Sequence, residues 1–373
     1  MSMLSYVAVH IIGTILRFFP WPSRTGLIEI GDPDRRSPVL VTCNYRLTVE
    51  RVRRALKGLD AYLLVANSRG INVWCASTGG LLTNHDVISV LKTSGIEERV
   101  DHRKVILPQL AATGIETRVV EKKTGWKMIW GPVYAQHIPV FLENSFKKTL
   151  DMREVEFPWM QRIEMAAAWA FPISIVLALI MIPLWRGAVL PGILLVWGLS
   201  LLVYVPFPLY SRWLGSEGRG SGLILSGFAI LWALLMLGLV GYALLVGSGW
   251  GLVFRWGFVS FIVLLFLSLD FLGSTPMYKS GLHEDRLLKV ILDEGRCRGV
   301  GYCEQVCPRN CYEVDRDEHR ARMPRVERCV QCGACIVQCP FDALCFQSPK
   351  GEVILPETIR KFKLNLLGKR LVQ

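Results

Sequence analysis

Two runs of cysteines near the end of the chain have the spacing of ligands to iron–sulfur clusters. The second run reads C-x2-C-x2-C-x3-C-P, an arrangement that holds a cubane of iron and sulfide. Its thiolates are Cys329, Cys332, Cys335 and Cys339. Because the frame occurs twice with a proline after each run, it favours clusters over a zinc site. The spacing therefore predicts low-potential electron transfer.

The first run keeps the same frame but has Val300 in the second ligand position. In two-cluster proteins the fourth cysteine of each run binds the other cluster. Cluster A then takes Cys297, Cys303 and Cys339, and cluster B takes Cys307, Cys329, Cys332 and Cys335. Cluster A has three alternatives: a three-iron cluster, a cubane with a non-cysteine ligand or one borrowed from Cys311, or loss. We expect a bound but altered cluster, and expect Cys311 and Cys345 to be packed cysteines.

Composition limits the class of protein that carries these runs. The chain has 373 residues, an apolar fraction of 51% and a formal net charge of +12. Eight of the eleven cysteines lie between residues 297 and 339 at metal-ligand spacing. This pattern indicates a reducing compartment and metal–sulfur chemistry rather than disulfides.

Four long apolar segments account for the high hydropathy: Ala166–Trp185, Ala188–Tyr210, Ser221–Val246 and Leu252–Leu272. Each has about the ~20 residues that a helix needs to cross a bilayer. Ionisable residues are nearly absent from them, whereas transporters need buried charges along their path. The sequence predicts a helical transmembrane domain of about four spans over residues 163–274 that serves as an anchor.

Basic residues flank these segments. Lys147, Lys148, Arg153 and Arg162 precede the first one, and Arg212 and Arg219 follow the second. We therefore interpret the positive charge as membrane-surface charge and not as a nucleic-acid site. An even number of spans places both ends of the chain in the cytoplasm, at the inner membrane.

The region before the apolar segments predicts an amphipathic segment and an α/β domain. Apolar residues recur at helical spacing within residues 1–25, and that helix either packs on the domain or lies on the membrane. Within 26–155, buried strands are expected at 37–45, 61–66 and 104–109, and helices at 48–59, 84–96 and 137–150. This alternation predicts a layered, largely parallel sheet. A small α+β two-cluster domain is expected at 283–350, with a basic tail at 351–373.

A lone tryptophan–cysteine motif lies inside the α/β region, at residues 72–80. It either continues a strand or forms a short helix that Asn72 caps and the glycines end. In the second case Cys75 lies in the first helical turn, where the helix dipole favours the thiolate. On its own, a cysteine among apolar neighbours is usually a packing residue.

Segments 38–48, 58–77, 102–110 and 125–142 together resemble the corrinoid domain of the mercury-methylation protein HgcA, most specifically at Asn-Val-Trp-Cys-Ala. That domain is similar to the corrinoid iron–sulfur protein of acetyl-CoA synthesis. The HgcA family continues into a membrane domain and works with a two-cluster ferredoxin, HgcB. The chain looks like a fusion of the two.

The resemblance implies that Cys75 coordinates cobalt on the lower face of a cobamide (a cobalamin-type corrinoid) from a cap helix. A soft, donating thiolate favours release of a methyl group to a soft electrophile such as Hg(II), and the clusters supply electrons that reduce cobalt. The implied activity is that of an anaerobic, corrinoid-dependent methyltransferase, with a methyl-donor protein and a low-potential electron donor as partners. The expected cofactor contacts in the motif are Asn72, Val73, Trp74, Ala76 and Ser77. Thr42 and Asn44 lie at the end of a predicted strand, where cofactor contacts gather in open α/β sheets, and they are either such contacts or turn formers. The backbone at Thr113-Gly114 and Gly131-Pro132 is also a candidate.

Three departures from the family pattern concern the acceptor. The family motif continues Gly-Lys, where this chain has Thr78 and Gly79. Cluster A lacks a cysteine at Val300, and the tail has no cysteine pair. Cobamide binding is thus better supported than mercury as acceptor. The alternatives are corrinoid methyl transfer to another acceptor, or a membrane-tethered ferredoxin with a degenerate corrinoid domain. Cys43 is a packing residue or a metal relay.

Overall fold

The computed structural model describes residues 3–211, 220–268, 288–365 and 368–371. The expectations that concern Arg212, Arg219 and Leu272 therefore fall outside the described residues. The chain divides into two compact units, one made of residues 1–13, 19–155 and 287–373 and the other of 14–18 and 156–286. The α/β part and the cysteine-rich part thus belong to one compact unit.

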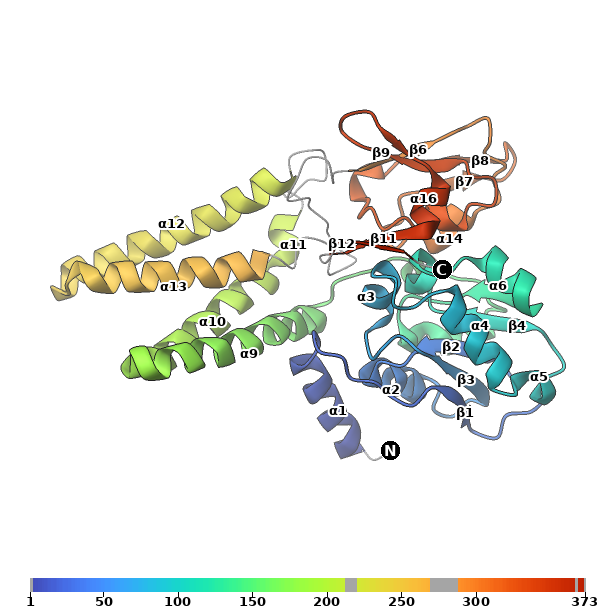
Figure 1. Cartoon of the computed structure of the whole chain (residues 1–373), viewed down its shortest axis with the longest axis horizontal. Coiled ribbons are helices and arrows are strands. Elements are labelled where there is room, and N and C mark those ends of the chain that lie inside the picture. Colours follow the sequence, from blue (N-terminus) through green and yellow to red (C-terminus); the bar gives the residue numbers. More distant parts are fainter. Residues whose placement is uncertain (1–2, 212–219, 269–287, 366–367, 372–373) are drawn as a thin grey trace. The chain divides into compact units, whose positions relative to one another are not determined.

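A five-stranded sheet in the order β1-β3-β2-β4-β5 forms the centre of the α/β part (Figure 1). The strands are β1 (Gly26–Ile30), β2 (Val39–Cys43), β3 (Ala61–Ala66), β4 (Lys104–Leu107) and β5 (Lys127–Trp130). The last four run parallel, and only the edge strand β1 is antiparallel to its neighbour within this sheet. The predicted largely parallel sheet is confirmed, and β1 and β5 are additional to the three expected strands.

Both faces of this sheet are covered, which explains why β2 and β3 are apolar throughout. Side chains alternate between the faces of a strand. Val39, Val41 and Cys43 therefore pack in one core, while Leu40 packs in a second core on the other face. Continuous apolar strands are typical of parallel sheets with a helix layer on each side.

The helices of this part are α2 (Arg46–Ala55), α3 (Val73–Thr78), α4 (Asn84–Thr93), α5 (Ile96–Arg99), α6 (Thr117–Thr124), α7 (Ile138–Glu143) and α8 (Leu150–Arg153), with 3-10 turns η1 (Gln109–Thr113) and η2 (Ala135–His137). Those expected at 48–59 and 84–96 are confirmed. The helix expected over 137–150 is wrong in length, because Ser145 and Phe146 adopt positive φ angles of 53° and 65° and end α7 early.

The N-terminal helix α1 (Met3–Ile15) packs on the α/β part through one side. Its Gly13 carbonyl accepts a hydrogen bond of 2.7 Å from the Tyr45 hydroxyl, and a Cβ at Gly13 would lie only 3.0 Å from Leu47 Cβ. Leu4 and Ile11 of the predicted apolar stripe are exposed. The helix therefore contacts the domain and leaves an apolar side uncovered within the described residues.

The cysteine-rich part consists of short elements. They are β6 (Lys289–Leu292), α14 (Tyr302–Val306), β7 (Glu313–Asp315), β8 (Arg320–Arg322), η7 (Val326–Arg328), α15 (Ala334–Gln338), β9 (Leu344–Gln347) and β10 (Val353–Ile354). The segment expected as a basic tail continues as α16 (Pro356–Lys361) and a hairpin of β11 (Phe362–Asn365) and β12 (Gly368–Leu371). Strand β11 lies beside α3.

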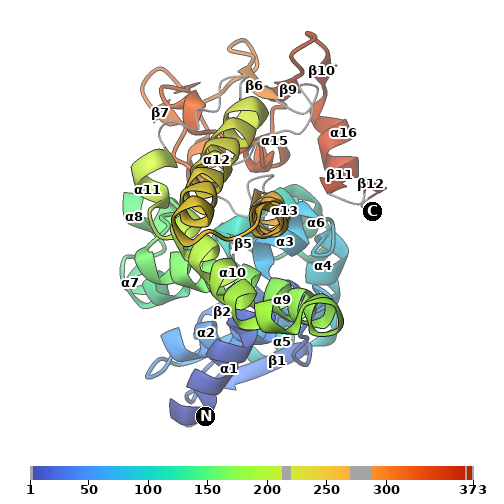
Figure 2. The same cartoon turned by 90° about the vertical axis from the view of Figure 1, so that its left-hand side faces the viewer.

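The second unit is helical, and Figure 2 shows its helices close to end-on. Its helices are α9 (Trp159–Leu184), η3 (Arg186–Ala188), α10 (Val189–Tyr204), α11 (Phe207–Tyr210), α12 (Gly220–Val246) and α13 (Trp250–Ser268). Four helical stretches in the described residues are long and apolar enough to cross a membrane by length and composition. Helix α9 packs on α10, and α12 packs on α13.

Candidate functional site

Cys75 lies in the short helix α3, which confirms the helical alternative for the tryptophan–cysteine motif. The Asn72 side chain caps this helix, because its Oδ1 accepts a 3.0 Å hydrogen bond from the Cys75 amide. At the other end the Thr78 hydroxyl donates to the Trp74 carbonyl at 2.8 Å. Cys75 is half-buried, whereas Trp74 is buried. The cap therefore fixes the backbone of the cysteine at a position that is not fully buried.

Asn44 organises the loop that leads into α3. Its Oδ1 accepts hydrogen bonds of 2.9 Å from the amide and the hydroxyl of Ser68 and from the amide of Gly70. Gly70 has a φ of 73°, and a Cβ there would lie 2.7 Å from the Pro22 nitrogen. Asn44 thus serves as a turn-forming residue, which is one of the two roles that its sequence position allows. Thr42 is buried on β2.

The turn η1 packs directly against α3. A Cβ at Gly114, the residue after η1, would lie 2.5 Å from the Leu82 carbonyl oxygen and 2.9 Å from that of Ser77. This close approach explains the glycine, and no cofactor contact is needed for it. Gly131 is similarly enclosed, because a Cβ there would lie 2.8 Å from Ile106 Cγ2. Corrin contact at these glycines stays a prediction.

Three polar atoms around α3 and η1 are buried without a hydrogen-bond partner in the described residues. They are Trp74 Nε1, Ser77 Oγ and Thr113 Oγ1. Unpaired buried donors are costly, and they fit a ligand rich in amide groups, as a corrinoid is. A soft thiol at Cys75 fits cobalt. Val73, Trp74, Ala76 and Ser77 are buried, so of the predicted contacts in the motif only Asn72 and Cys75 offer accessible surface.

The ligands expected for cluster B lie together and accept hydrogen bonds at sulfur. The Tyr312 hydroxyl donates to Cys335 Sγ at 3.1 Å, and the Gln331 amide donates to Cys329 Sγ at 3.3 Å. The Cys311 amide donates to Cys307 Sγ at 3.3 Å. Donors of this kind set the reduction potential of a cluster.

The two cysteine runs have nearly the same backbone conformation. Gly299 and Gly301 have φ angles of 62° and 80°, and their counterparts Gln331 and Gly333 have 52° and 75°. The amide of Ala343 donates to Cys339 Sγ at 3.4 Å, as that of Cys311 does to Cys307. Val300 therefore occupies the backbone position that Cys332 has in the second run.

A pocket marks the place expected for cluster A. Its wall contains the three predicted ligands Cys297, Cys303 and Cys339, together with Val300 and Arg298. The donor set and the pocket fit an iron–sulfur cluster with three protein thiolates. In the described ranges no three His, Cys, Asp or Glu side chains are grouped as ligands of a single ion. The thiolates of a cluster, by contrast, each bind a different iron.

The remaining cysteines lie elsewhere. The Cys311 amide donates to Cys307 Sγ at 3.3 Å, and hydrogen bonding to Cys307 and Cys329 raises the pKa of the Cys311 thiol. Cys311 therefore lies beside the cysteines expected for cluster B, and it is absent from the wall of the pocket expected for cluster A. Cys345 alternates on β9 with the buried Leu344 of the pocket wall. Cys43 is fully buried in the sheet core, and burial raises the pKa of its thiol.

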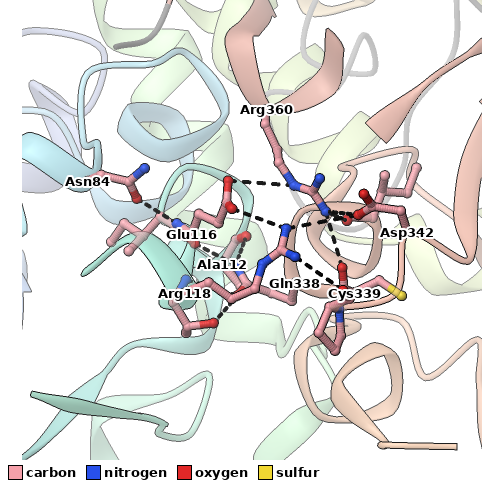
Figure 3. Close-up of polar contacts among 12 residues, drawn as sticks. Asn84, Ala112, Glu116, Arg118, Gln338, Cys339, Asp342 and Arg360 are labelled. Atoms are coloured by element: carbon pink, nitrogen blue, oxygen red, sulfur yellow. Dashed lines mark hydrogen bonds and ion pairs between the residues drawn. The ribbon is translucent and has the colours of Figure 1, made fainter. Parts of the chain in front are cut away.

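The cysteine-rich part docks on the α/β part through Gln338 (Figure 3). Its Nε2 donates to the carbonyls of Ala112, at 2.8 Å, and Ile115, and its Oε1 accepts from the Thr117 hydroxyl at 3.0 Å. Gln338 is 2% exposed. One side chain thus satisfies three polar groups between η1 and the start of α6. These hydrogen bonds fix the position of α15 on the α/β part.

Arg360 reinforces this contact from α16. It donates to the carbonyls of Ile336 and Cys339, at 3.3 and 3.1 Å, and pairs with Asp342. Its Nε lies 3.5 Å from Glu116 of the α/β part. Figure 3 shows the guanidinium between these two carboxylates. The segment expected as a basic tail thus takes part in the interface.

A second polar cluster links η1 to α14. The Lys148 ammonium donates to Gln109 Oε1 at 2.6 Å, to the Gln305 carbonyl at 2.7 Å and to the Gly131 carbonyl at 3.2 Å. Gln109 Nε2 donates to the Cys307 carbonyl at 3.3 Å. Burial lowers the pKa of Lys148 well below its usual value.

The interpretation of Lys148 and Arg153 as membrane-flanking charges is therefore wrong. The Lys148 side chain is half-buried and its ammonium donates to Gln109 and the Gln305 carbonyl, and Arg153 pairs with Glu304 at 3.3 Å. Sequence reasoning also missed Gln109, Gln338 and Arg360. No local signal identifies them, because each acts on a partner that is distant in the chain.

The comparisons with known proteins match the α/β part and the cysteine-rich part to different families. Residues 18–142 match the family described as CO dehydrogenase/acetyl-CoA synthase delta subunit, and residues 289–344 match the 4Fe-4S dicluster domain. The chain is similar over 128 residues to the acetyl-CoA decarbonylase/synthase complex subunit gamma of Methanopyrus kandleri, with 38% identity over 34% of this chain and 27% of that protein. The Methanothermobacter thermautotrophicus protein of the same name is 40% identical over 32% of this chain and 26% of its own length. The chain thus spans about a quarter of the length of these curated relatives.

Proposed function

We propose that the chain is a membrane-anchored, corrinoid-dependent methyl-transfer protein that carries its own iron–sulfur electron supply, in the manner of HgcA and HgcB. The observation that carries the proposal is the position of η1, which contacts α3 with Cys75 on one side and α14 and α15 on the other. The similarity of residues 18–142 to proteins of acetyl-CoA synthesis and of 289–344 to 4Fe-4S dicluster domains supports it.

Cys75 is the proposed axial ligand. A bound cobamide would supply a cobalt centre that carries the methyl group. The protein holds the sulfur on a capped helical turn, where Asn72 fixes the amide of the cysteine at 3.0 Å. A preorganised thiolate donates electron density without rearrangement of the backbone, and this favours transfer of the methyl group to a soft acceptor.

Cluster B is the proposed electron donor to that centre. Cys332, one of its ligands, packs against the core of the α/β part, and the Cys307 carbonyl accepts from Gln109 of η1. The backbone that carries both ligands is therefore held against the element that supports α3. Electrons would enter from a soluble low-potential donor, and a separate methyl-donor protein would methylate the cofactor.

Membrane attachment through the second unit is part of the proposal. Four helical stretches in the described residues have the required length and hydropathy. We place the chain in the inner membrane, with the α/β and cysteine-rich parts in the cytoplasm, where thiols stay reduced. The exposed apolar side of α1 would contribute to binding at the membrane surface.

The acceptor is proposed to be a soft electrophile. Hg(II) fits this class, but the tail, residues 351–373, contains no cysteine that would deliver it. An assay of methylmercury formation in a host that carries only this gene distinguishes Hg(II) from another soft acceptor. We expect little or no product, and robust synthesis would assign mercury.

Cobamide binding is the direct test of the proposed function. The protein is purified without oxygen, reconstituted with a cobamide and compared with Cys75→Ala by visible absorption. We expect bound cofactor in both proteins and a shifted spectrum in Cys75→Ala, because the sulfur ligand is lost. Cys345→Ala, another half-buried cysteine, should leave the spectrum unchanged. Identical spectra for wild type and Cys75→Ala would refute the axial-ligand assignment, and absence of any binding would refute the proposed function.

A further inference from the structure

The corner of cluster A that lacks a cysteine opens to solvent. Val300 stands in the backbone position of Cys332, and its relative exposure is 44%. Cys332, by contrast, packs against the core of the α/β part. The two runs share a backbone conformation, so the space for a fourth ligand is kept while the ligand itself is missing.

The protein does not fill that corner from elsewhere in the described residues. The pocket wall around Val300 contains, besides the three predicted ligands, only apolar residues, glycines, Arg298 and Tyr302. Cys311 is absent from the wall of this pocket, and its amide donates to Cys307 Sγ at cluster B. Cys345 alternates with Leu344 on β9 and so points to the other face of its sheet.

We propose that the corner of cluster A at Val300, in the wall of this pocket, binds a small external thiolate, which completes the coordination that the three cysteines leave open. The inference rests on the clusters of the proposed function but not on its corrinoid. A sulfur ligand matches the three cysteines already present. Binding is a ligand substitution at the fourth iron. The thiol gives its proton to solvent, its sulfur forms the new Fe–S bond, and the water or hydroxide on that iron leaves, so no electron is transferred.

The charge and shape of the pocket suit this class of ligand. Arg298 lines the pocket and is exposed, so its guanidinium attracts an anion. Leu292 and Phe341 provide apolar wall for a short carbon chain. At cluster B the equivalent position, Cys332, is partly buried against the α/β part, whereas Val300 is 44% exposed. The two clusters therefore differ in their access to solutes.

The test uses the full chain, purified and reconstituted with iron and sulfide without added thiol. Deuterated 2-mercaptoethanol is then titrated, and electron–nuclear double resonance of the reduced protein detects deuterons near iron. We expect a saturable deuteron coupling in the wild type and in Val300→Ala, which keeps the pocket open. Val300→Cys should abolish it, because an internal thiolate takes the corner. Arg298→Gln should weaken thiol affinity roughly two- to fivefold, the effect of one exposed charge.

Iron content and electron paramagnetic resonance distinguish the remaining outcomes. Mild oxidation should convert cluster A to a three-iron form in the wild type and not in Val300→Cys. Absence of deuteron coupling in a wild-type protein with both clusters present would overturn the proposal, as would equal coupling in wild type and Val300→Cys. Failure of both proteins to take up iron would refute the cluster assignment itself. Loss of cobamide binding alone leaves this result unaffected.

Discussion

Replacing Gln338 by alanine should undock the cysteine-rich part from the α/β part. The substitution removes hydrogen bonds to the Ala112 and Ile115 carbonyls and to Thr117, at a position that is 2% exposed. Each buried group left without a partner costs about 1 to 3 kcal/mol. Because such costs are not additive among neighbours, we expect a total of about 3 to 5 kcal/mol.

Hydrogen exchange followed by mass spectrometry measures this effect. A single unfolding free energy is poorly defined for a multidomain chain, whereas local opening is directly observable. A loss of about 3 kcal/mol corresponds to exchange faster by roughly a hundredfold. We expect it in peptides that cover η1 and α15, and expect little change in β2 and β3.

Gln347→Ala is the matched control. Gln347 lies on β9 and makes one exposed hydrogen bond of 3.4 Å, to the Gly351 carbonyl. Its loss should change stability by no more than about 0.5 kcal/mol. Wild-type protection of residues 109–117 in Gln338→Ala would refute the conclusion that this side chain holds the two parts together.

Four further substitutions test the rest of the site. Gly114→Ala should destabilise the packing of η1 on α3 by about 1 to 3 kcal/mol, because the added Cβ would lie 2.5 Å from a carbonyl oxygen. Limited proteolysis should then cleave the chain at η1 faster than in the wild type, and an unchanged cleavage rate would contradict the packing. Asn44→Ala leaves two amides of the loop before α3 without a hydrogen-bond acceptor and should accelerate hydrogen exchange in that loop. An unaltered exchange rate would contradict the conclusion that Asn44 holds the loop. Tyr312→Phe removes a donor to a cluster sulfur and should lower the reduction potential of cluster B in a redox titration, so an equal or higher potential would contradict it. The pKa of Lys148 is lower in the folded than in the unfolded chain, so the stability of the fold should rise with pH between these two pKa values. Lys148→Met should remove this rise, which thermal unfolding from neutral pH to about pH 10 would measure. The same dependence of stability on pH in the variant would assign the rise to another group.

The chemistry of the cysteine runs could be read from spacing alone. A C-x2-C-x2-C-x3-C-P frame brings its thiolates together within one short loop and helix, so neighbours in sequence are also neighbours in space. The structure gathers Cys329 and Cys335 with Cys307, as the spacing predicts. The same holds for the capped helix at Cys75, since Asn72 lies three residues before the cysteine it caps.

The largely parallel sheet was also predictable, because apolar strands alternate with amphipathic helices. The edge strand β1 was not expected. It pairs antiparallel with β3, which lies more than thirty residues away, and no periodic pattern announces such a partner. The expected helix at 137–150 failed because Ser145 and Phe146 adopt left-handed backbone conformations that their residue types do not signal.

The sequence by itself determined which groups can do chemistry, since local spacing and the type of each side chain suffice to place Cys75 and the cluster ligands. Only the tertiary structure decided how these groups are joined. Lys148 appears in sequence as a surface charge beside a membrane, but folding places its ammonium between Gln109 and the backbone of α14. Contacts between residues distant in the chain depend on how the two parts pack, and packing has no period or spacing that a sequence displays.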